Sequence, residues 1–190
     1  MKKKTIVPLI VFLLGICLVG LIVYKIDSHE TEQRHITAQL NATTYGERIK
    51  NEITNGIAIT DTLKQVLISE NGKISQFDTI AENIMSDVIE SIQLAPDGNV
   101  TDIYPSEGTE ASKIDLLQDK DCSKISCYAR DNHVIITQGP FDLKRGDCGI
   151  AVRNPVYLKD ENNQEYFWGF TIVIPVSYTH LRAHETCADL

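Results

Sequence analysis

Hydrophobic positions are unevenly distributed along the chain, and the longest apolar run stands near its start. Residues 6–24 are 19 residues without a charged side chain. As a helix, such a run rises about 28 Å, close to the roughly 30 Å hydrocarbon core of a bilayer. A cleaved signal peptide has a shorter apolar region followed by a small-x-small site, and no such site occurs where this run ends at Tyr24-Lys25. The pattern therefore predicts an uncleaved transmembrane helix, with residues 1–25 as start and anchor.

Residues 26–70 are polar, with a narrow stripe of apolar positions at helical spacing. The stripe comprises Ile36, Leu40, Ile49, Ile53, Ile57, Leu63, Val66 and Leu67. It predicts a long stalk helix that could be interrupted at Gly46 and Gly56. A polar helix with one thin apolar seam suits pairing with a second copy of the chain. The second half of the stripe fits equally well a helix that packs on its own domain.

Residues 71–174 change from helical to strand-like periodicity. Asn71-Gly72 is expected to end the stalk helix, Ser75 to cap a second helix, and the apolar spacing from Phe77 to Ile92 to continue that helix. Asp97-Gly98 between two short apolar runs predicts a β-hairpin. A short helix is expected around 121–130, followed by strands at 133–138, 149–158 and 166–174, with a turn at 160–163.

This order of elements predicts an α+β protein: an N-terminal transmembrane helix, a long stalk helix, and a PAS-like domain with a five-stranded antiparallel sheet. The helical crossover lies between the second and third strands. One face of such a sheet would pack on the long helix, and the other would enclose a pocket for a small molecule.

The charge distribution indicates orientation and excludes one class of partner. Lys2, Lys3 and Lys4 favour a cytoplasmic N-terminus, so everything after Lys25 is expected outside. The chain has a net charge of −8, and with the four lysines of the first 25 residues set aside the remainder carries −12. That acidity argues against nucleic acid or anionic lipid as the partner of the outer part.

Residues 175–190 are interpreted as foreign to the protein. The segment from Val176 to Thr186 reads VSYTHLRAHET, which matches one reading frame of a common transposase sequencing adapter. The spacing of His180 and His184, with Glu185 beside them, would otherwise suggest a metal site. We assign that constellation and Cys187 no function, and we expect the reading frame to be truncated after Ile174.

The remaining residues offer little for catalysis. The sequence contains no GxSxG, HExxH or phosphate-binding loop, and no Cys/His cluster with metal-ligand spacing. We therefore expect no enzyme activity, no metal and no cofactor. Cys122, Cys127 and Cys148 lie outside the membrane, where one disulfide is permitted, and Cys127–Cys148 is the favoured pair.

Six short segments in the outer part resemble one family. They are Ile92-Gln-Leu-Ala-Pro-Asp-Gly, Ile103-Tyr-Pro, Ile114-Asp-Leu-Leu, Gln138-Gly-Pro-Phe-Asp-Leu, Arg153-Asn-Pro-Val-Tyr and Phe167-Trp-Gly-Phe. In this order along residues 36–174, they resemble the CHASE domain, the extracytoplasmic sensing module of bacterial diguanylate cyclases and histidine kinases and of plant cytokinin receptors. The resemblance implies a receptor with two membrane helices, a homodimeric stalk and a cytoplasmic kinase, GGDEF or EAL output domain.

The resemblance also implies ligand-binding positions. Asp115 matches an acid that holds the ligand in cytokinin receptors, whereas Gln138 stands where those receptors have a short hydroxyl residue, so the same ligand is not expected. From the residues themselves, Arg153 could bind a ligand carboxylate bidentately, and Tyr104 and Trp168 could line the pocket. For each, the alternative is structural: a helix cap for Asp115, a salt bridge for Arg153, a core position for the aromatics.

Together these features predict the ligand-sensing part of a transmembrane receptor in the cell membrane, with a small molecule as its partner. The alternative is a membrane-anchored protein-binding or adhesive module without signalling output.

Overall fold

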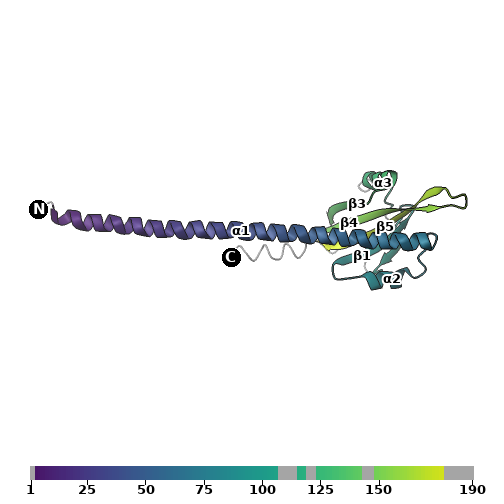
Figure 1. The fold of residues 1–190 in the computed structure, drawn as a ribbon, viewed down its shortest axis with the longest axis horizontal. Helices are drawn as coiled ribbons and strands as arrows, with labels where there is room; N and C mark the ends of the chain where they lie inside the picture. Colours follow the sequence, from purple (N-terminus) through teal and green to yellow (C-terminus); the bar gives the residue numbers. More distant parts are fainter. Residues whose placement is uncertain (1–2, 107–114, 119–122, 143–147, 178–190) are drawn as a thin grey trace. The chain divides into compact units, whose positions relative to one another are not determined.

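The structure, a computed structural model, describes residues 3–106, 115–118, 123–142 and 148–177, and side chains at 12–106, 115–118, 124–139 and 149–175. The elements are three helices and five strands within these ranges (Figure 1): α1 (Lys3–Ser69), α2 (Phe77–Ile84), β1 (Ile89–Pro96), β2 (Asp102–Tyr104), α3 (Ser123–Asn132), β3 (Ile136–Asp142), β4 (Cys148–Lys159) and β5 (Glu165–Ser177). The chain divides into two compact units, residues 1–48 and 49–190.

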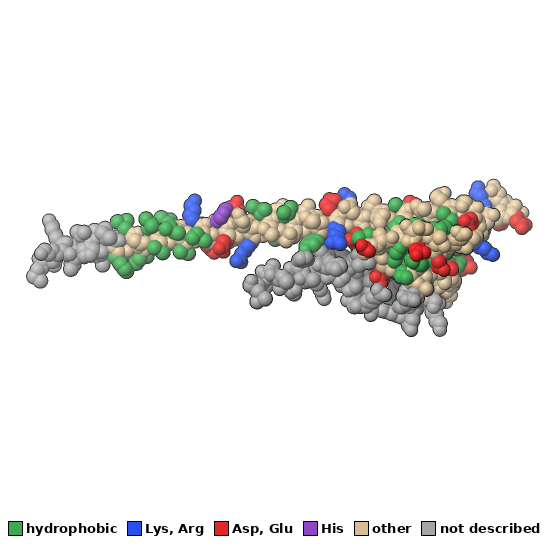
Figure 2. Space-filling model, turned by 90° about the horizontal axis from the view of Figure 1, so that it is seen from below, with side chains coloured by type: hydrophobic (Ala, Val, Ile, Leu, Met, Phe, Trp, Pro, Cys, Tyr) green, Lys and Arg blue, Asp and Glu red, His purple; other side chains and the backbone are tan. Residues whose placement is uncertain are grey.

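The first unit consists of the N-terminal part of α1. Its described large apolar side chains from Phe12 to Ile26 are all exposed, and Figure 2 shows a hydrophobic surface on this part of the helix. By length and composition this helix can cross a membrane, since an 18-residue window reaches a mean hydropathy of 1.6 and is not buried at all. Farther along the same unit, the seam residues Ile36 and Leu40 are 58% and 64% exposed.

The second unit begins within α1, whose last turns pack on the sheet. Ile59, Leu63 and Leu67 are buried in one cluster with strand residues. The helix continues through both Gly46 and Gly56, so the interruption allowed by the sequence does not occur. At Gly56 the reason for glycine is close packing: an added Cβ would lie 3.0 Å from Cγ2 of Val152 on β4. The second half of the apolar stripe is therefore core of its own domain.

The sheet has the order β2-β1-β5-β4-β3, and every neighbouring pair is antiparallel. The last strand, β5, thus lies at the centre, with β1 and β4 on its two sides (Figure 1). The predicted hairpin closes as expected, because the amides of Gly98 and Asn99 donate to the carbonyls of Ala95 and Pro96. The predicted fold class is confirmed: α+β, with a long N-terminal apolar helix and a five-stranded antiparallel sheet.

The second helix is shorter than its periodicity predicts. α2 ends at Ile84, and Ile89 and Ile92 belong to β1. A β-bulge between Ile89 and Ser91 puts both isoleucines in the same core cluster although they are three residues apart. This spacing imitates the helical one. Ser75 does not cap α2; its backbone amide and hydroxyl both donate to the carboxylate of Glu70.

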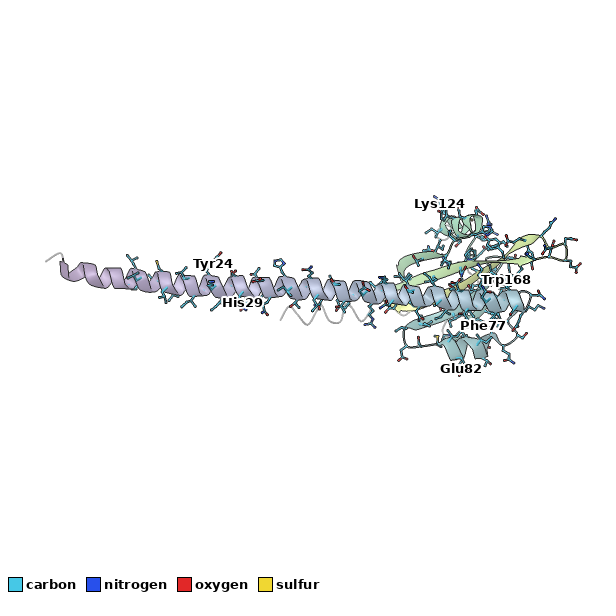
Figure 3. The ribbon with its side chains drawn as sticks, in the orientation of Figure 1. Tyr24, His29, Phe77, Glu82, Lys124 and Trp168 are labelled. Atoms are coloured by element: carbon cyan, nitrogen blue, oxygen red, sulfur yellow. The ribbon has the colours of Figure 1, made fainter. Side chains whose placement is uncertain are left out.

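Helix α2 covers the same side of the sheet as α1. Phe77 is buried and points toward the sheet, whereas Glu82 points away from it (Figure 3). We call this side of the sheet, with Ile92, Val156 and Val173, the α1 face. The opposite side, which we call the α3 face, carries Ala95, Ala151, Phe170 and Ile172 and packs against Leu116 and the α3 residue Ala129.

Candidate ligand-binding face

The α3 face holds an unusual set of buried polar side chains. Ser91, Gln93 and Arg153 are 2%, 5% and 5% exposed, and each belongs to one of the two strands that flank β5. Alternation along the strands puts them on the α3 face, because their neighbours in sequence, Ile92 and Asn154, lie on the α1 face. Polar groups are buried at a cost unless other groups bind them, and hydrogen bonds within this set offset part of that cost.

The register of the sheet fixes how these side chains are spaced. Ile172 of β5 pairs with Gln93 on one side and with Arg153 on the other. Because neighbouring strands lie about 4.8 Å apart, the backbones of Gln93 and Arg153 are roughly 10 Å apart across Ile172. The same row continues to Ile103 on β2 and Ile136 on β3. The apolar side chain of Ile172 thus separates the polar side chains of Gln93 and Arg153.

A side-chain hydrogen bond is found on each side of Ile172. The Gln93 amide donates to the hydroxyl of Ser91 over 2.9 Å. On the other side of Ile172, Nη1 of Arg153 donates to Oε1 of Gln138 on β3. The predicted candidates Gln138 and Arg153 are therefore brought together, and we call these four residues, Ser91, Gln93, Gln138 and Arg153, the polar cluster.

Helix α3 adds a further polar group on this face. Ser126 is completely buried, one turn before Ala129, and its hydroxyl has no hydrogen-bond partner among the residues that the structure describes. Lys124, by contrast, is exposed and points away from the sheet (Figure 3). The buried face of α3 therefore brings a buried hydroxyl to the same side of the sheet as the polar cluster.

Tyr157 of β4 attaches the C-terminal end of α3 to the sheet. Its hydroxyl donates to the backbone carbonyl of Arg130, and its ring stacks on His133, with centroids 3.9 Å apart. His133 has φ 55° and ends the helix there, where the sequence suggested a strand edge. Tyr157 also touches Phe167, which in turn touches Phe170 of the core. Tyr157 thus holds the C-terminal end of the helix that carries Ser126.

The surroundings of Tyr157 make its protonation a measurable reporter. Burial raises its pKa above the ordinary value of 10.0, the Arg130 charge opposes this, and the carboxylates of Asp131 and Glu165 add to it. The unfolded tyrosine therefore loses its proton at lower pH than the folded one, so stability falls as pH rises above about 10. We expect Tyr157→Phe to abolish this part of the alkaline loss and to cost about 0.5–1.5 kcal/mol at neutral pH. Urea denaturation of both proteins, at neutral pH and above about pH 10, measures the free energy of unfolding. If the variant loses as much stability at alkaline pH as the wild-type protein, the prediction is wrong.

Asp115 lies at the edge of the α3 face in a structural role. Its Oδ1 accepts the amides of Leu117 and Gln118 over 2.9 and 3.1 Å, and its backbone bridges to Asn99 of the hairpin. Between these contacts, Leu116 is buried in the α3-face cluster. The carboxylate therefore holds the turn that places Leu116 over the face.

Tyr104 and Trp168 lie elsewhere. Both pack on the cluster of the α1 face, and Trp168 covers the turn at Gly72, where an added Cβ would lie 2.8 Å from the indole nitrogen. The structure thus does not bring these two aromatics together with Gln138 and Arg153. Both aromatics are partly buried and contribute hydrophobic surface to that cluster.

Three residues of the face were not singled out from the sequence: Ser91, Gln93 and Ser126. In β1 the polar positions alternate with Ile92 and Leu94, which normally indicates a strand with one face in solvent. The alternation was the available signal, but it does not reveal that both faces are covered.

Polar contacts also cross the α1 face. The side-chain amide of Asn154, only 1% exposed, donates to Asp61 of α1 over 2.7 Å. Lys64 of α1 donates to the carbonyl of Pro155 over 3.0 Å. Beside them, the hydroxyl of Thr171 donates to the carbonyl of Thr60 over 3.0 Å. Strands β4 and β5 are therefore joined to α1 by directional bonds as well as by apolar packing.

Several expectations fall on residues that are only partly described. Cys127 is a half-buried free thiol, so the favoured bond to Cys148 is not formed in the structure; Cys122 lies outside the described residues. Val176 and Ser177 continue β5, and the remainder of the segment interpreted as foreign, including His180 and His184, lies outside the described residues. In the part of the chain that is described, no group of three or more His, Cys, Asp or Glu residues could hold a metal ion.

Comparison with solved structures finds the same fold in a second protein. The chain is similar to an extracellular ligand-binding receptor from Desulfohalobium retbaense DSM5692, with a TM-score of 0.54 and 12% identity over 70% of this chain. The match covers 24% of the receptor's own length, so this chain corresponds to about a quarter of that structure. No family model and no curated protein matches the chain. At this identity the likeness shows a shared fold.

Proposed function

We propose that this chain is the extracytoplasmic sensing part of a CHASE-type transmembrane receptor, which binds a small molecule on the α3 face of its sheet. The observation that carries the proposal is the polar cluster on the α3 face, where Ser91, Gln93 and Arg153 are buried on the side of the sheet opposite α1. A helix able to cross a membrane and the fold shared with a ligand-binding receptor support it. Gln138 and Arg153 form the centre of the proposed site, with Asp115 at its edge.

The sheet offers a physical route from ligand to membrane. Arg153 and Asn154 are neighbours on β4, with the first on the proposed ligand side and the second bonded to α1. A displacement of β4 or β5 on binding would therefore strain the contacts to Asp61, Lys64 and Thr60. A ligand shifts α1 in this way only if it binds one arrangement of strand and helix better than the other.

In this proposal Lys2 to Lys4 stay in the cytoplasm, the sensing domain lies outside, and α1 pairs with its copy through Ile36 and Leu40. Both seam residues are exposed, as a pairing surface requires. The output domain, a diguanylate cyclase or phosphodiesterase or a histidine kinase, would follow a second membrane helix beyond Ile174.

Sequencing the source DNA with long reads across the codons after Ile174 tests the receptor assignment. We expect a second apolar run of about 20 residues, followed by a kinase, GGDEF or EAL domain. If the VSYTHLRAHET codons prove genuine, or the frame ends there, the receptor assignment is wrong. A singly anchored protein-binding module then becomes the better description.

The location of the site has its own test. The full chain is purified in detergent, denatured, and any released small molecule is quantified by mass spectrometry. We expect Gln138→Ala to release less of it than the wild-type protein, and Asp102→Ala, an exposed acid on the edge strand β2, to release the same amount. Equal release from the wild-type protein and the Gln138 variant would place the ligand elsewhere.

A further inference from the structure

The outer part of α1 offers a surface for a second copy of the chain, and the inference drawn from it rests on the proposed function. Every side chain from residue 12 to residue 44 is exposed. Helices gain most of their stability by packing an apolar face, and the described residues supply no such packing to this stretch. We propose that residues 22–43 of two copies form a parallel, in-register coiled coil, in which Lys25 of each copy binds Glu30 of the other.

The apolar residues of this stretch follow the alternating four- and three-residue spacing of a coiled coil. The series, which we call the stalk seam, is Ile22, Ile26, His29, Gln33, Ile36, Leu40 and Thr43. It contains every isoleucine and leucine between residues 25 and 44, and the side chains of its isoleucines and its leucine are 50–64% exposed. Because coiled-coil helices bury one residue in about 3.5, the series forms a single continuous contact line along the helix.

The charges beside the stalk seam favour a parallel pair. The distribution of Lys and Arg sets the direction in which a membrane helix inserts, so two copies of one chain run in the same direction. Lys25 directly precedes Ile26, and Glu30 directly follows His29. Residues that flank the seam in this way form salt bridges between parallel helices, with the partner residue five positions farther along. Lys25 of each copy therefore faces Glu30 of the other, and two opposite-charge pairs form.

Glu30 can bind this second cation in addition to its partner within the helix. One of its carboxylate oxygens lies 3.9 Å from Nη2 of Arg34, and its side chain remains 64% exposed. A carboxylate has two oxygens with about four acceptor sites, so Arg34 does not exhaust them. Exposed ion pairs contribute little energy each. The Lys25–Glu30 pairs therefore select the arrangement of the two helices, while the apolar residues of the stalk seam supply most of the binding.

Two polar residues, His29 and Gln33, interrupt the apolar part of the stalk seam. A polar residue at such a position costs stability but specifies the register and the number of helices, because it is best placed opposite its own equivalent. In the proposed pair, His29 meets His29 of the second copy, and Gln33 meets Gln33. His35, a second exposed histidine of this stretch, is six residues from His29 and is thus turned about 120° away around the helix. It serves as a matched control for His29.

Charge reversal tests the contact between Lys25 and Glu30. The full chain is diluted in detergent, and light scattering measures the equilibrium between single and paired chains. We expect Lys25→Glu to weaken pairing roughly tenfold and the double variant Lys25→Glu/Glu30→Lys to restore most of it. The control is Lys25→Glu/Asp27→Lys, which has the same net charge as the double variant but reverses a charge away from the stalk seam, so its pairing stays weak. If both double variants pair equally well, the contact is not made.

Substitutions at His29 test the orientation and the register. With the native cysteines replaced by serine, we expect His29→Cys to form a disulfide-linked dimer under mild oxidation and His35→Cys to form none. Equivalent seam residues of parallel helices approach within the roughly 4–7 Å between Cα atoms that a disulfide spans. His29→Leu should also strengthen pairing roughly tenfold, because it removes a polar residue from the contact line, whereas His35→Leu should leave pairing unchanged.

The remaining outcomes separate this inference from the proposed function. If the chain pairs but cross-links equally at positions 29 and 35, or at neither, the parallel stalk seam is wrong, while pairing of α1 with its copy stands. If the wild-type chain stays single at every concentration, both the stalk seam and the pairing are wrong. The ligand site and the second membrane helix are then still decided by release from the Gln138 variant and by the DNA beyond Ile174.

Discussion

Gly169→Ala is expected to cost the domain roughly 3–5 kcal/mol, a large part of the stability of an ordinary domain. Gly169 has φ 151°, in a region that side chains rarely adopt. An added Cβ would lie 2.1 Å from the carbonyl oxygen of Ala95 and 2.8 Å from Cα of Pro96. Neither strand can give way easily, because Gly169 pairs with Pro96 on one side and with Val156 on the other.

Gly46→Ala is the matched control for this prediction. Gly46 lies in α1 with nothing within 4 Å of an added Cβ, so alanine should be neutral there or stabilise the helix by up to about 1 kcal/mol. Urea denaturation followed by the fluorescence of Trp168, the single tryptophan of the chain, compares the three proteins. If Gly169→Ala unfolds at the same urea concentration as the wild-type protein, the register between β1 and β5 is wrong.

The same glycine illustrates why the elements were predictable and their details were not. Alternation and turn residues were sufficient to predict the five strands, and the Asp97-Gly98 turn closes as expected. The bulges could not be predicted, because the extra residue is decided by contacts with a distant strand. The bulge in β1 gives Ile89 and Ile92 a spacing that resembles that of a helix. The bulge between β4 and β5 leaves Trp168 without a paired residue, because Phe167 pairs with Tyr157 and Gly169 with Val156.

The candidate site was predictable in part for a related reason. A side chain on a strand changes face when the register moves by one residue, and the sequence does not contain the register. Arg153 and Gln138 reach the α3 face together, whereas Tyr104 and Trp168 reach the α1 face. Nothing in the residue types themselves distinguishes these two results, since aromatic residues suit a pocket and a core equally well.

Leu63→Ala is expected to cost about 2–5 kcal/mol, whereas Leu40→Ala on the same helix should stay within about 0.5 kcal/mol of the wild-type protein. Leu63 is 0% exposed in the cluster that joins α1 to β4 and β5, so its removal leaves a cavity. Leu40 is 64% exposed, so its removal leaves none. Both changes delete the same atoms from the same helix, and only the surroundings differ.

This pair also separates the two roles that the apolar stripe was predicted to have. The free energy of unfolding from urea denaturation reports the docking of α1 on the sheet, and light scattering of the full chain in detergent reports pairing of the helix with a second copy. We expect Leu63→Ala to lower only the free energy of unfolding, and Leu40→Ala to weaken only the pairing with a second copy. The reason is that buried and exposed apolar residues of one helix make different contacts. If both variants still pair with a second copy, the seam does not form the proposed dimer. Equal unfolding of Leu63→Ala and the wild-type protein would mean that α1 is not bound to the sheet, and the route from ligand to membrane through Asn154 would then be lost.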